Sequence, residues 1–570
     1  MTIRDAILSL PEEVLTAIVS LVSDSCLVNV SQVCRKLNRI CSSPLEMRQR
    51  CIRLRWWEER HKIEEKKRLP RITDVDWRGL FLYRFRVGLA TTHLLDQIIA
   101  NPANHIINFN HIVDFGYDAK DCLKVHADVS DDEVDDPLAR RYHATAAIRY
   151  IHRRRALAIW DRVRRVDDVP LEVALLALDL FITTTPEPDV DEYVADIDGL
   201  AAAFLAATPK FSSFVETEEK AVTLIKWMWS QGFSGFNGAQ MVRYRALKNV
   251  FIGLTIRTIR TAIPLTLVAI FCAIARRVGI TAHPCAYPGH VLAIVEDPTT
   301  GRYQYYDVFR GPDKDPRADR ANLLEGLTPD QLKVLAPASV SAMVIRAAQN
   351  LISTLQLQPM ELLEVNRGYP NICEHSALYA ALTAMVVLSV ARPSMQVVEH
   401  MTRQIPADFP MDVRFLEEEL LPRVDVSGRQ FLENVCGALR ADTLPPVSRR
   451  DNPENRSVLH RVGTVFKHRR YDFIGAIFGW TNECRSIEGE GEEWISERVN
   501  VENTPRGRNQ PFYHVLVDDG TVRYIAEENI QPIRPKNVDA LIMLAGKYFK
   551  RFDPTEGRFV SNVKVEFPDD

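Results

Sequence analysis

The N-terminal segment, residues 7–56, carries three short helical patterns of hydrophobic positions. In two of them apolar residues recur at intervals of three and four, at Leu15, Ile18, Val19 and Val22 and at Val30, Val33, Cys34 and Leu37. This spacing predicts helices with one apolar face each. The segments 9–12 and 43–46 have the composition of helix starts, with a Ser, an early Pro and a Glu. Because so small a bundle buries little surface by itself, we expect its apolar faces to meet a partner.

The pattern stays mostly helical up to residue 440. We expect a charged helix over 57–68, ended by Pro70, and further helices over 80–165 that are interrupted by the acidic loop 128–136. The basic stretch 140–165 is interpreted as the solvated side of a helix, with nucleic-acid binding as the weaker alternative. The residues expected on the buried side of this helix are Ala147, Ile151, Leu157 and Trp160.

After a Pro-, Arg- and Asn-rich linker predicted at 441–458, the pattern changes to that of strands. Aromatic and β-branched residues predict short strands within 463–480 and 512–525, and Asp519-Gly520 predicts a hairpin turn. A last amphipathic helix is expected at about 538–549. The fold class is therefore multidomain α+β, with a small sheet in a largely helical middle and a β-rich C-terminal region.

Composition narrows the function classes. The chain has 570 residues, of which 46% are hydrophobic and 26% charged, with a net charge of −4, so we expect several globular domains and no chain-wide nucleic-acid binder. No signal peptide and no membrane span are expected. Ten Cys without a C-x-x-C pair fit reduced thiols in the cytoplasm and/or nucleus. No metal-ligand spacing and no phosphate loop occur, so no cofactor is expected.

The N-terminal pattern resembles an F-box. The matching residues are Leu10, Pro11, Val14, Leu15, Ile18, Leu27, Val33, Cys34 and Leu37. In that family the motif binds the Skp-type adaptor of a cullin ubiquitin ligase, so the resemblance implies that these residues form an adaptor-binding site. An ordinary three-helix cap at the N-terminus is the alternative interpretation.

The middle of the chain holds the framework of a Cys-His-Asp site. A buried helix is expected over 262–278, ended by Gly279, and it is followed by a strand that begins near His290 and a strand with Asp307. In such sites the Cys lies at the helix N-terminus, which favours the thiolate, and the Asp orients the His. This region resembles the SirB-type transglutaminase-like family over about 165–350, on the segments 169–179, 191–200, 232–233 and 262–309.

The nucleophile of that framework is missing. No Cys occurs near 263–266, and Thr266 is a poor substitute because a hydroxyl needs a stronger base than a thiol. Cys272 is expected inside the helix, and Cys373 lies out of order, before a later helix. We therefore expect no catalysis, and we interpret His290 and Asp307 as a remnant pair or the floor of a binding groove. A Cys-dependent hydrolase or transferase stays the alternative.

The C-terminal region resembles the YccV/HspQ-like family, described in bacteria as a hemimethylated-DNA-binding domain with a small bent β-barrel. The resemblance rests on segments within 463–530, and the chain departs from it at Thr481 and in an acidic insertion, 488–493. The candidate ligand surface is His468, Arg469, Arg470, Tyr471, Trp480, Trp494, Phe512 and Tyr513. Because nearby acids offset the cations, we prefer a protein or degron ligand, with DNA as the alternative.

Taken together, the regions expected are an F-box at 4–56, a helical connector at 57–165, a transglutaminase-like domain with following helices at 166–440, the linker 441–458, a β-barrel at 459–536, and a C-terminal helix and tail at 537–570. In this order they resemble a family of F-box proteins. The resemblance implies a non-catalytic substrate receptor of an SCF-type ubiquitin ligase. The implied partners are the Skp-type adaptor, a cullin scaffold and a protein substrate, with no membrane.

Overall fold

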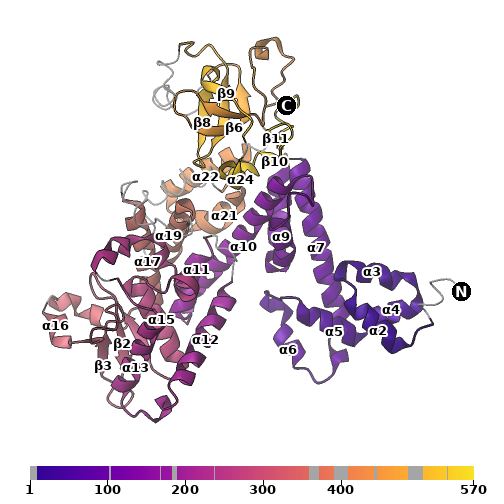
Figure 1. Ribbon diagram of the computed structural model, residues 1–570. Coiled ribbons are helices and arrows are strands. Elements are labelled where there is room, and N and C mark those ends of the chain that lie inside the picture. The colour runs from indigo at the N-terminus through magenta and orange to yellow at the C-terminus, as the bar shows by residue number, and fades with distance from the viewer. Residues whose placement is uncertain are drawn as a thin grey trace. The chain divides into compact units, whose positions relative to one another are not determined.

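The computed structural model describes residues 9–101, 104–166, 168–182, 189–236, 238–325, 327–357, 372–389, 409–441, 446–484, 505–535 and 537–570. These residues are mostly helical, with three small antiparallel sheets (Figure 1). The chain divides into two compact units, one formed by 1–151 with 440–570 and the other by 152–439. The α+β class expected from the sequence is confirmed.

Within the described residues, the N-terminal bundle has four helices, α2 (Glu12–Leu21), α3 (Asp24–Val33), α4 (Arg35–Cys41) and α5 (Pro44–Arg53). The second predicted helix is thus two helices, because Cys34 is extended (φ −162°, ψ 165°) and its Sγ accepts the N–H of Leu37 at 3.5 Å. Ser43 caps α5 as predicted, accepting the N–H of Glu46 at 3.3 Å. Pro11, rather than Ser9, occupies the N-cap position of α2.

The core of this bundle is completed by a later helix, α7 (Trp77–Ala100). Trp77 and Phe81 pack with the buried side chains of the bundle, which are Leu15, Val19, Leu27, Leu37, Ile40, Cys41, Met47 and Cys51. The buried Arg50 cross-links the bundle by donating to Glu46 Oε1 and to the carbonyl of Val19, each at 2.7 Å. The bundle therefore has a closed interior, and its outer apolar residues are not needed to form it.

The charged segment after the bundle is not the single helix that we expected over 57–68. Lys62 adopts a left-handed conformation (φ 47°), which separates a 3₁₀ turn, Glu59–His61, from the short α6, Ile63–Lys67. Three more helices follow, α8 (His105–Asp114), α9 (Lys120–Ala127) and α10 (Pro137–Val166). The predicted buried side of α10 is confirmed, since Ala147, Ile151, Leu157 and Trp160 are all buried.

The second unit is built around α15 (Pro264–Arg277), whose residues 264–275 are all buried. The predicted end at Gly279 is confirmed by its φ of +83°. Against α15 lies a sheet with the strand order β1 (Ala282–Cys285), β2 (Leu292–Glu296), β3 (Tyr303–Tyr306) and β4 (Arg317–Ala318). The other helices of the unit include α11 (Leu171–Asp179), α12 (Val190–Ala207), α13 (Thr217–Ser230), α14 (Ile252–Leu254), α16 (Arg320–Leu324), α17 (Val340–Leu355), α19 (Glu374–Leu388), α21 (Val413–Phe415) and α22 (Val426–Ala441).

Among the residues that the structure describes, no single helix is both long and apolar enough to cross a bilayer. The helices Ile252–Ile259 and Pro264–Arg277 meet that test only as a pair, which is bent by 82°.

The C-terminal region holds a five-stranded antiparallel sheet in the order β8-β7-β6-β5-β9. Its strands are β5 (Val465–His468), β6 (Ile474–Thr481), β7 (Phe512–Val517), β8 (Val522–Ala526) and β9 (Ile530–Pro532). The predicted hairpin is confirmed by the β7–β8 pairing, with Gly520 at φ +82° in its turn. The outer strands β8 and β9 are not paired with each other in the described residues, so the sheet is not a closed barrel.

The chain ends differently from the expected helix and tail. The last helix, α24 (Asp539–Ala545), stops before the predicted residue 549, and a hairpin of β10 (Phe549–Asp553) and β11 (Arg558–Ser561) follows. This hairpin packs on the sheet through Gly463, whose carbonyl accepts the N–H of Phe559 at 2.9 Å. Gly463 has a φ of +88°, and a Cβ there would lie 2.0 Å from the Phe559 carbonyl oxygen. The close approach therefore requires glycine.

Candidate functional site

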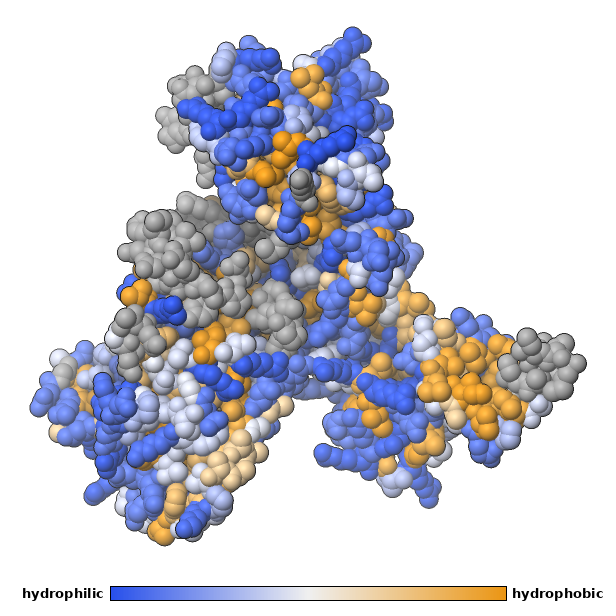
Figure 2. Space-filling view, viewed as in Figure 1, coloured by the Kyte–Doolittle hydropathy of each residue, from blue (hydrophilic) through white to orange (hydrophobic). Residues whose placement is uncertain are grey.

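A row of apolar side chains is exposed on α2. Val14, Ile18 and Leu21 have exposed fractions of 43%, 44% and 87%, and their spacing of four and three residues places them on one side of the helix. Figure 2 shows apolar side chains gathered over the N-terminal helices. We call Val14, Ile18, Leu21 and the exposed Val33 of α3 the outer apolar face.

The residues predicted to bind an adaptor fall into three groups. Leu15, Leu27 and Leu37 are buried, so in this structure they form the core that supports the outer face. Leu10 and Cys34 are half-buried, and Pro11, Val14, Ile18 and Val33 are exposed. Leu21 was not predicted from the sequence, although it extends the row of Val14 and Ile18 by one turn.

Polar contacts fix the start of α2 to α4. Arg39 pairs with Glu12 at 2.6 Å on the surface, and the Lys36 ammonium donates to the carbonyl of Leu10 at 3.0 Å. A surface pair of this kind adds little stability. Together with the buried Arg50, however, these contacts join helices that present the outer apolar face.

In the second unit, the sheet brings His290 and Asp307 together. In the antiparallel β2–β3 pair, Ala293 lies opposite Tyr306, so the residues just before β2 and just after β3 meet at one end. His290 Nε2 lies 2.9 Å from Asp307 Oδ1. The predicted pair thus exists as a hydrogen-bonded unit.

Asp307 is held by several further donors. Its Oδ2 accepts from Arg310 Nε at 3.0 Å, and its Oδ1 accepts the N–H of Phe309 at 3.1 Å. Burial by itself would raise the pKa of Asp307, but the hydrogen bond and charge of His290, followed by the charge of Arg310, hold that pKa below its ordinary value. Asp307 is therefore an ionised anchor for the His290 ring.

None of the three nucleophile candidates joins this pair. Thr266 is fully buried, and its hydroxyl donates to the carbonyl of Asn249 at 2.9 Å. Cys272 is buried in α15, and burial raises the pKa of its thiol far above the ordinary value. Cys373 is exposed at the N-cap of α19, and among the described residues no contact joins it to His290. The described site therefore has an oriented imidazole without a nucleophile beside it.

An arginine that no sequence pattern indicated also lies at this site. Tyr287-Pro288-Gly289-His290 forms a tight turn, in which the N–H of His290 donates to the Tyr287 carbonyl at 3.3 Å and Gly289 has a φ of +73°. Arg346 of α17 donates from Nη1 to the same carbonyl oxygen at 3.0 Å. Because the two segments are far apart in the chain, no local pattern could have revealed this contact.

Fewer of the candidate ligand residues in the C-terminal sheet are exposed than the sequence predicted. Trp480, Phe512 and Tyr513 are buried, and the Tyr513 hydroxyl donates to Glu527 at 2.7 Å. His468 is also buried, and its Nδ1 accepts the N–H groups of Arg470 and Tyr471, each at 3.1 Å. These four residues shape the sheet. Arg469, Arg470 and Tyr471 stay exposed, whereas Trp494 and the insertion 488–493 lie outside the described residues.

Charges around this exposed segment are partly balanced. Lys467 pairs with Asp472 at 2.6 Å, and Arg523 pairs with Asp519. The guanidinium of Arg470 lies 5.5 Å from the centre of the Tyr471 ring. Within the ranges that the structure describes, no group of three or more His, Cys, Asp or Glu side chains could hold a metal ion.

Comparisons with known proteins match the three regions in turn. Residues 7–53 match an F-box-like family, residues 191–349 the transglutaminase-like superfamily, and residues 458–556 the family described as hemimethylated DNA-binding protein YccV like. F-box only protein 21 of Pongo abelii, Homo sapiens and Mus musculus is 22% identical in each case, covering 95% of this chain and 88% of the relative. No solved structure matches. The chain therefore combines F-box-like, transglutaminase-like and YccV-like regions and is similar to F-box only protein 21 along nearly its whole length.

Proposed function

We propose that this chain is the substrate-recognition subunit of an SCF-type cullin ubiquitin ligase, acting in the cytoplasm and/or nucleus. The outer apolar face binds the Skp-type adaptor, which links the chain to the cullin scaffold. The observation that carries the proposal is the exposed row Val14, Ile18 and Leu21 within the F-box-like match at 7–53. A row of exposed apolar side chains over a closed core favours a protein interface, because burying apolar surface releases about 25 cal/mol per Å².

The chain itself performs no covalent chemistry in this proposal. Support comes from the transglutaminase-like region, where His290 and Asp307 are paired at 2.9 Å while Thr266 and Cys272 are both buried. An imidazole can activate a nucleophile only within hydrogen-bond reach of it. The middle region then serves to hold a protein target near the ubiquitin-charged enzyme that the cullin recruits.

The C-terminal sheet is a second surface for a protein target. Arg469 and Arg470 are its exposed cations near Tyr471, while Lys467 and Arg523 are committed to carboxylates. Strong DNA binding needs many phosphate-facing cations and is steeply salt-dependent. The balanced charges of this sheet favour a protein ligand over DNA.

The proposal is tested by assembly in solution. Purified chain, Skp-type adaptor and cullin scaffold are mixed in all pairs and together, and complexes are separated by size. We expect the cullin to co-elute with the chain only when the adaptor is present. Ile18→Glu should abolish that ternary complex, because it puts a charge into the apolar interface.

The matched control is Val215→Glu. Val215 is an exposed apolar residue in the second unit, with an exposed fraction of 86%, and it lies outside the F-box-like match. This control should assemble like the unchanged protein. A complex that forms equally well with Ile18→Glu, or no complex with the unchanged protein, contradicts the proposed function.

A further inference from the structure

The site beside His290 contains a cation that no described carboxylate neutralises. Arg346 is half-buried, and among the described residues its only hydrogen bond goes to the Tyr287 carbonyl at 3.0 Å. Burial lowers the pKa of Arg346, and its electrostatic neighbours are Tyr244 and Cys285 rather than an acid. A partly desolvated guanidinium is costly unless an anion pairs with it.

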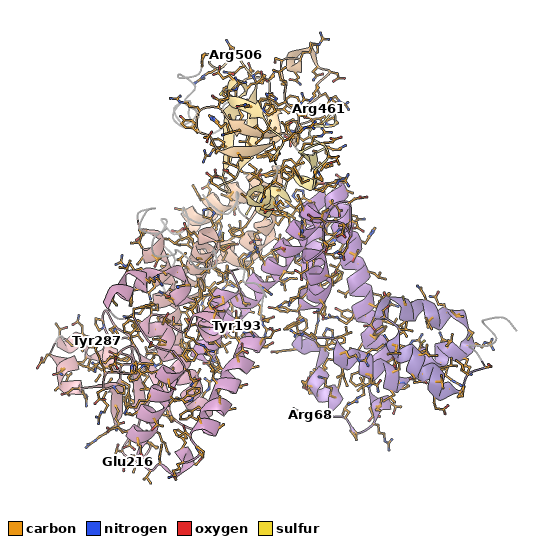
Figure 3. The ribbon with its side chains drawn as sticks, viewed as in Figure 1. Arg68, Tyr193, Glu216, Tyr287, Arg461 and Arg506 are labelled. Carbon is orange, nitrogen blue, oxygen red and sulfur yellow. The ribbon has the colours of Figure 1, made fainter. Side chains whose placement is uncertain are left out.

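The rest of the guanidinium can be reached from outside. Arg346 carries five N–H donors, and none of its nitrogen atoms is among those that are sealed from solvent without a partner. The contact with Tyr287 fixes the side chain in place, and it leaves donors free for a ligand. Figure 3 labels Tyr287, which begins the turn that ends at His290.

Aromatic side chains extend from His290 to Tyr244, while Arg346 contacts the turn that ends at His290. The Tyr244 ring lies 5.9 Å from the Phe309 ring, and the Phe309 ring lies 5.6 Å edge-on from the imidazole of His290. Burial raises the pKa of the Tyr244 hydroxyl, and the positive charge of Arg346 opposes that rise. No described residue accepts or donates a hydrogen bond at that hydroxyl. The site therefore has one cation, on Arg346, one free hydroxyl, on Tyr244, and an aromatic wall formed by the rings of Tyr244 and Phe309.

The charges at this site favour one class of ligand. Asp307 is bonded to both His290 and Arg310, so its negative charge is already engaged by these two side chains. Arg346 then adds one positive charge, and the exposed Arg245 adds only a screened one. A single guanidinium with a neighbouring hydroxyl matches a carboxylate, which carries one negative charge, better than a phosphate with nearly two.

We propose that the site lined by Arg346, Tyr244 and His290 binds a carboxylate of the protein target, supplied by a chain terminus or by an Asp or Glu side chain. The inference rests on the proposed function, since it assigns the class of target that the middle region holds. Arg346 binds the carboxylate through its free N–H donors. The wall of Tyr244 and Phe309 contacts the apolar part of the same residue.

Four peptide pools test this proposal on the full chain. All are twelve residues long, and their random positions contain no Asp or Glu. One pool ends in a free carboxylate and one in an amide. The other two also end in an amide, and they carry a fixed central Glu or a fixed central phosphoserine. Retention on the immobilised chain is measured for each pool. We expect at least one carboxylate pool to bind about 10- to 100-fold more tightly than the plain amide pool, the range for a hydrogen bond to a charged group.

Variants decide whether Arg346 binds the ligand or only supports the turn. Arg346→Gln should remove the difference between the carboxylate and amide pools. Tyr244→Phe, which deletes one hydroxyl, should reduce that difference about two- to tenfold. Arg302→Gln changes an exposed arginine on the β2–β3 connection and should leave it unchanged. Adaptor binding, measured separately on each variant, should be unaffected, so that a failure of the ligase proposal is seen independently.

Three results would overturn the inference. The first is equal retention of carboxylate and amide pools by the unchanged chain. The second is an equal loss of both pools with Arg346→Gln, which would make Arg346 a support of the Tyr287 turn alone. The third is tighter retention of the phosphoserine pool than of either carboxylate pool. A preference between the terminal and the side-chain carboxylate would identify the source and support the proposal.

Discussion

The buried pair of Arg153 and Asp412 offers a strong test of how the second unit is held together. The two residues are 259 positions apart, and Arg153 Nη2 lies 2.6 Å from Asp412 Oδ1. Their side chains are only 2% and 1% exposed, and Tyr379 donates to the other oxygen of Asp412 at 3.1 Å. Arg153 belongs to the basic stretch 140–165 that was predicted to be solvated, and for this residue the prediction is wrong.

Replacing Arg153 by Met leaves the Asp412 carboxylate buried without its counter-charge. Removing one partner of such a pair costs about 3–5 kcal/mol. The neighbouring Arg154 is exposed on the same helix, so Arg154→Met is a matched control that should change stability by less than about 0.5 kcal/mol. Arg153→Met with Asp412→Leu should recover most of the loss, because two apolar side chains replace the pair.

The loss should also depend on pH. Burial raises the pKa of Asp412, and the charge of Arg153 opposes that rise. Without Arg153 the folded state therefore binds a proton that the unfolded state releases above about pH 4, and stability should fall as pH rises through that window. Arg153→Met should be least destabilised in mild acid.

Hydrogen exchange read by mass spectrometry suits this chain, because it reports on one unit at a time when global unfolding is not two-state. The amides of α19 and of residues 413–420 should exchange faster in Arg153→Met than in Arg154→Met. If the two variants exchange alike at neutral pH, the pair does not stabilise the unit and the reasoning fails.

Three further predictions follow from the described contacts. Gly463→Ala should destabilise the C-terminal sheet by about 2–4 kcal/mol in thermal unfolding, since it adds a clash with Phe559 to an unfavourable φ. The control is Gly507→Ala, which should cost only about 1 kcal/mol because Gly507 has a φ of +58° but open space around it. Equal losses of stability in the two variants would contradict the contact with Phe559. Because the pKa of Asp307 is lowered, its ionised carboxylate stabilises the folded state above the ordinary carboxyl pKa of about 3.9, and this stabilisation is lost as pH falls through the lower folded value. Asp307→Asn should remove this acid dependence, measured by hydrogen exchange of β2 and β3. Cys373 should react with iodoacetamide at the rate of an ordinary exposed thiol, and His290→Ala should leave that rate unchanged; a slower reaction in this variant would favour the cysteine-enzyme alternative.

Local patterns predicted the elements well where each one carries its own signal. The Asp519-Gly520 turn, the buried helix ended by Gly279 and the capping of α5 by Ser43 all depend on neighbours in sequence. The pairing of His290 with Asp307 was also predicted, for a different reason. The order of two adjacent antiparallel strands fixes which residues meet at one end of the pair.

The misses depend on contacts between distant segments or on single backbone angles. Cys34 and Lys62 interrupt helices whose side-chain pattern is continuous, and no hydrophobic period records a change of φ or ψ. Trp480, Phe512 and Tyr513 resemble ligand-binding aromatics in sequence, yet the sheet buries them. The hairpin at 549–561 had a signal in its aromatic residues and in Gly557, but the neighbouring helical pattern concealed it.

The central claim is that the outer apolar face binds the Skp-type adaptor. Its most direct test is a calorimetric titration of purified adaptor into the full chain. Val14→Ala and Ile18→Ala should each weaken binding by about 1–3 kcal/mol, as central interface residues do, and Val215→Ala should not change it. Equal affinity for all four proteins, or no measurable heat with the unchanged chain, would contradict the account.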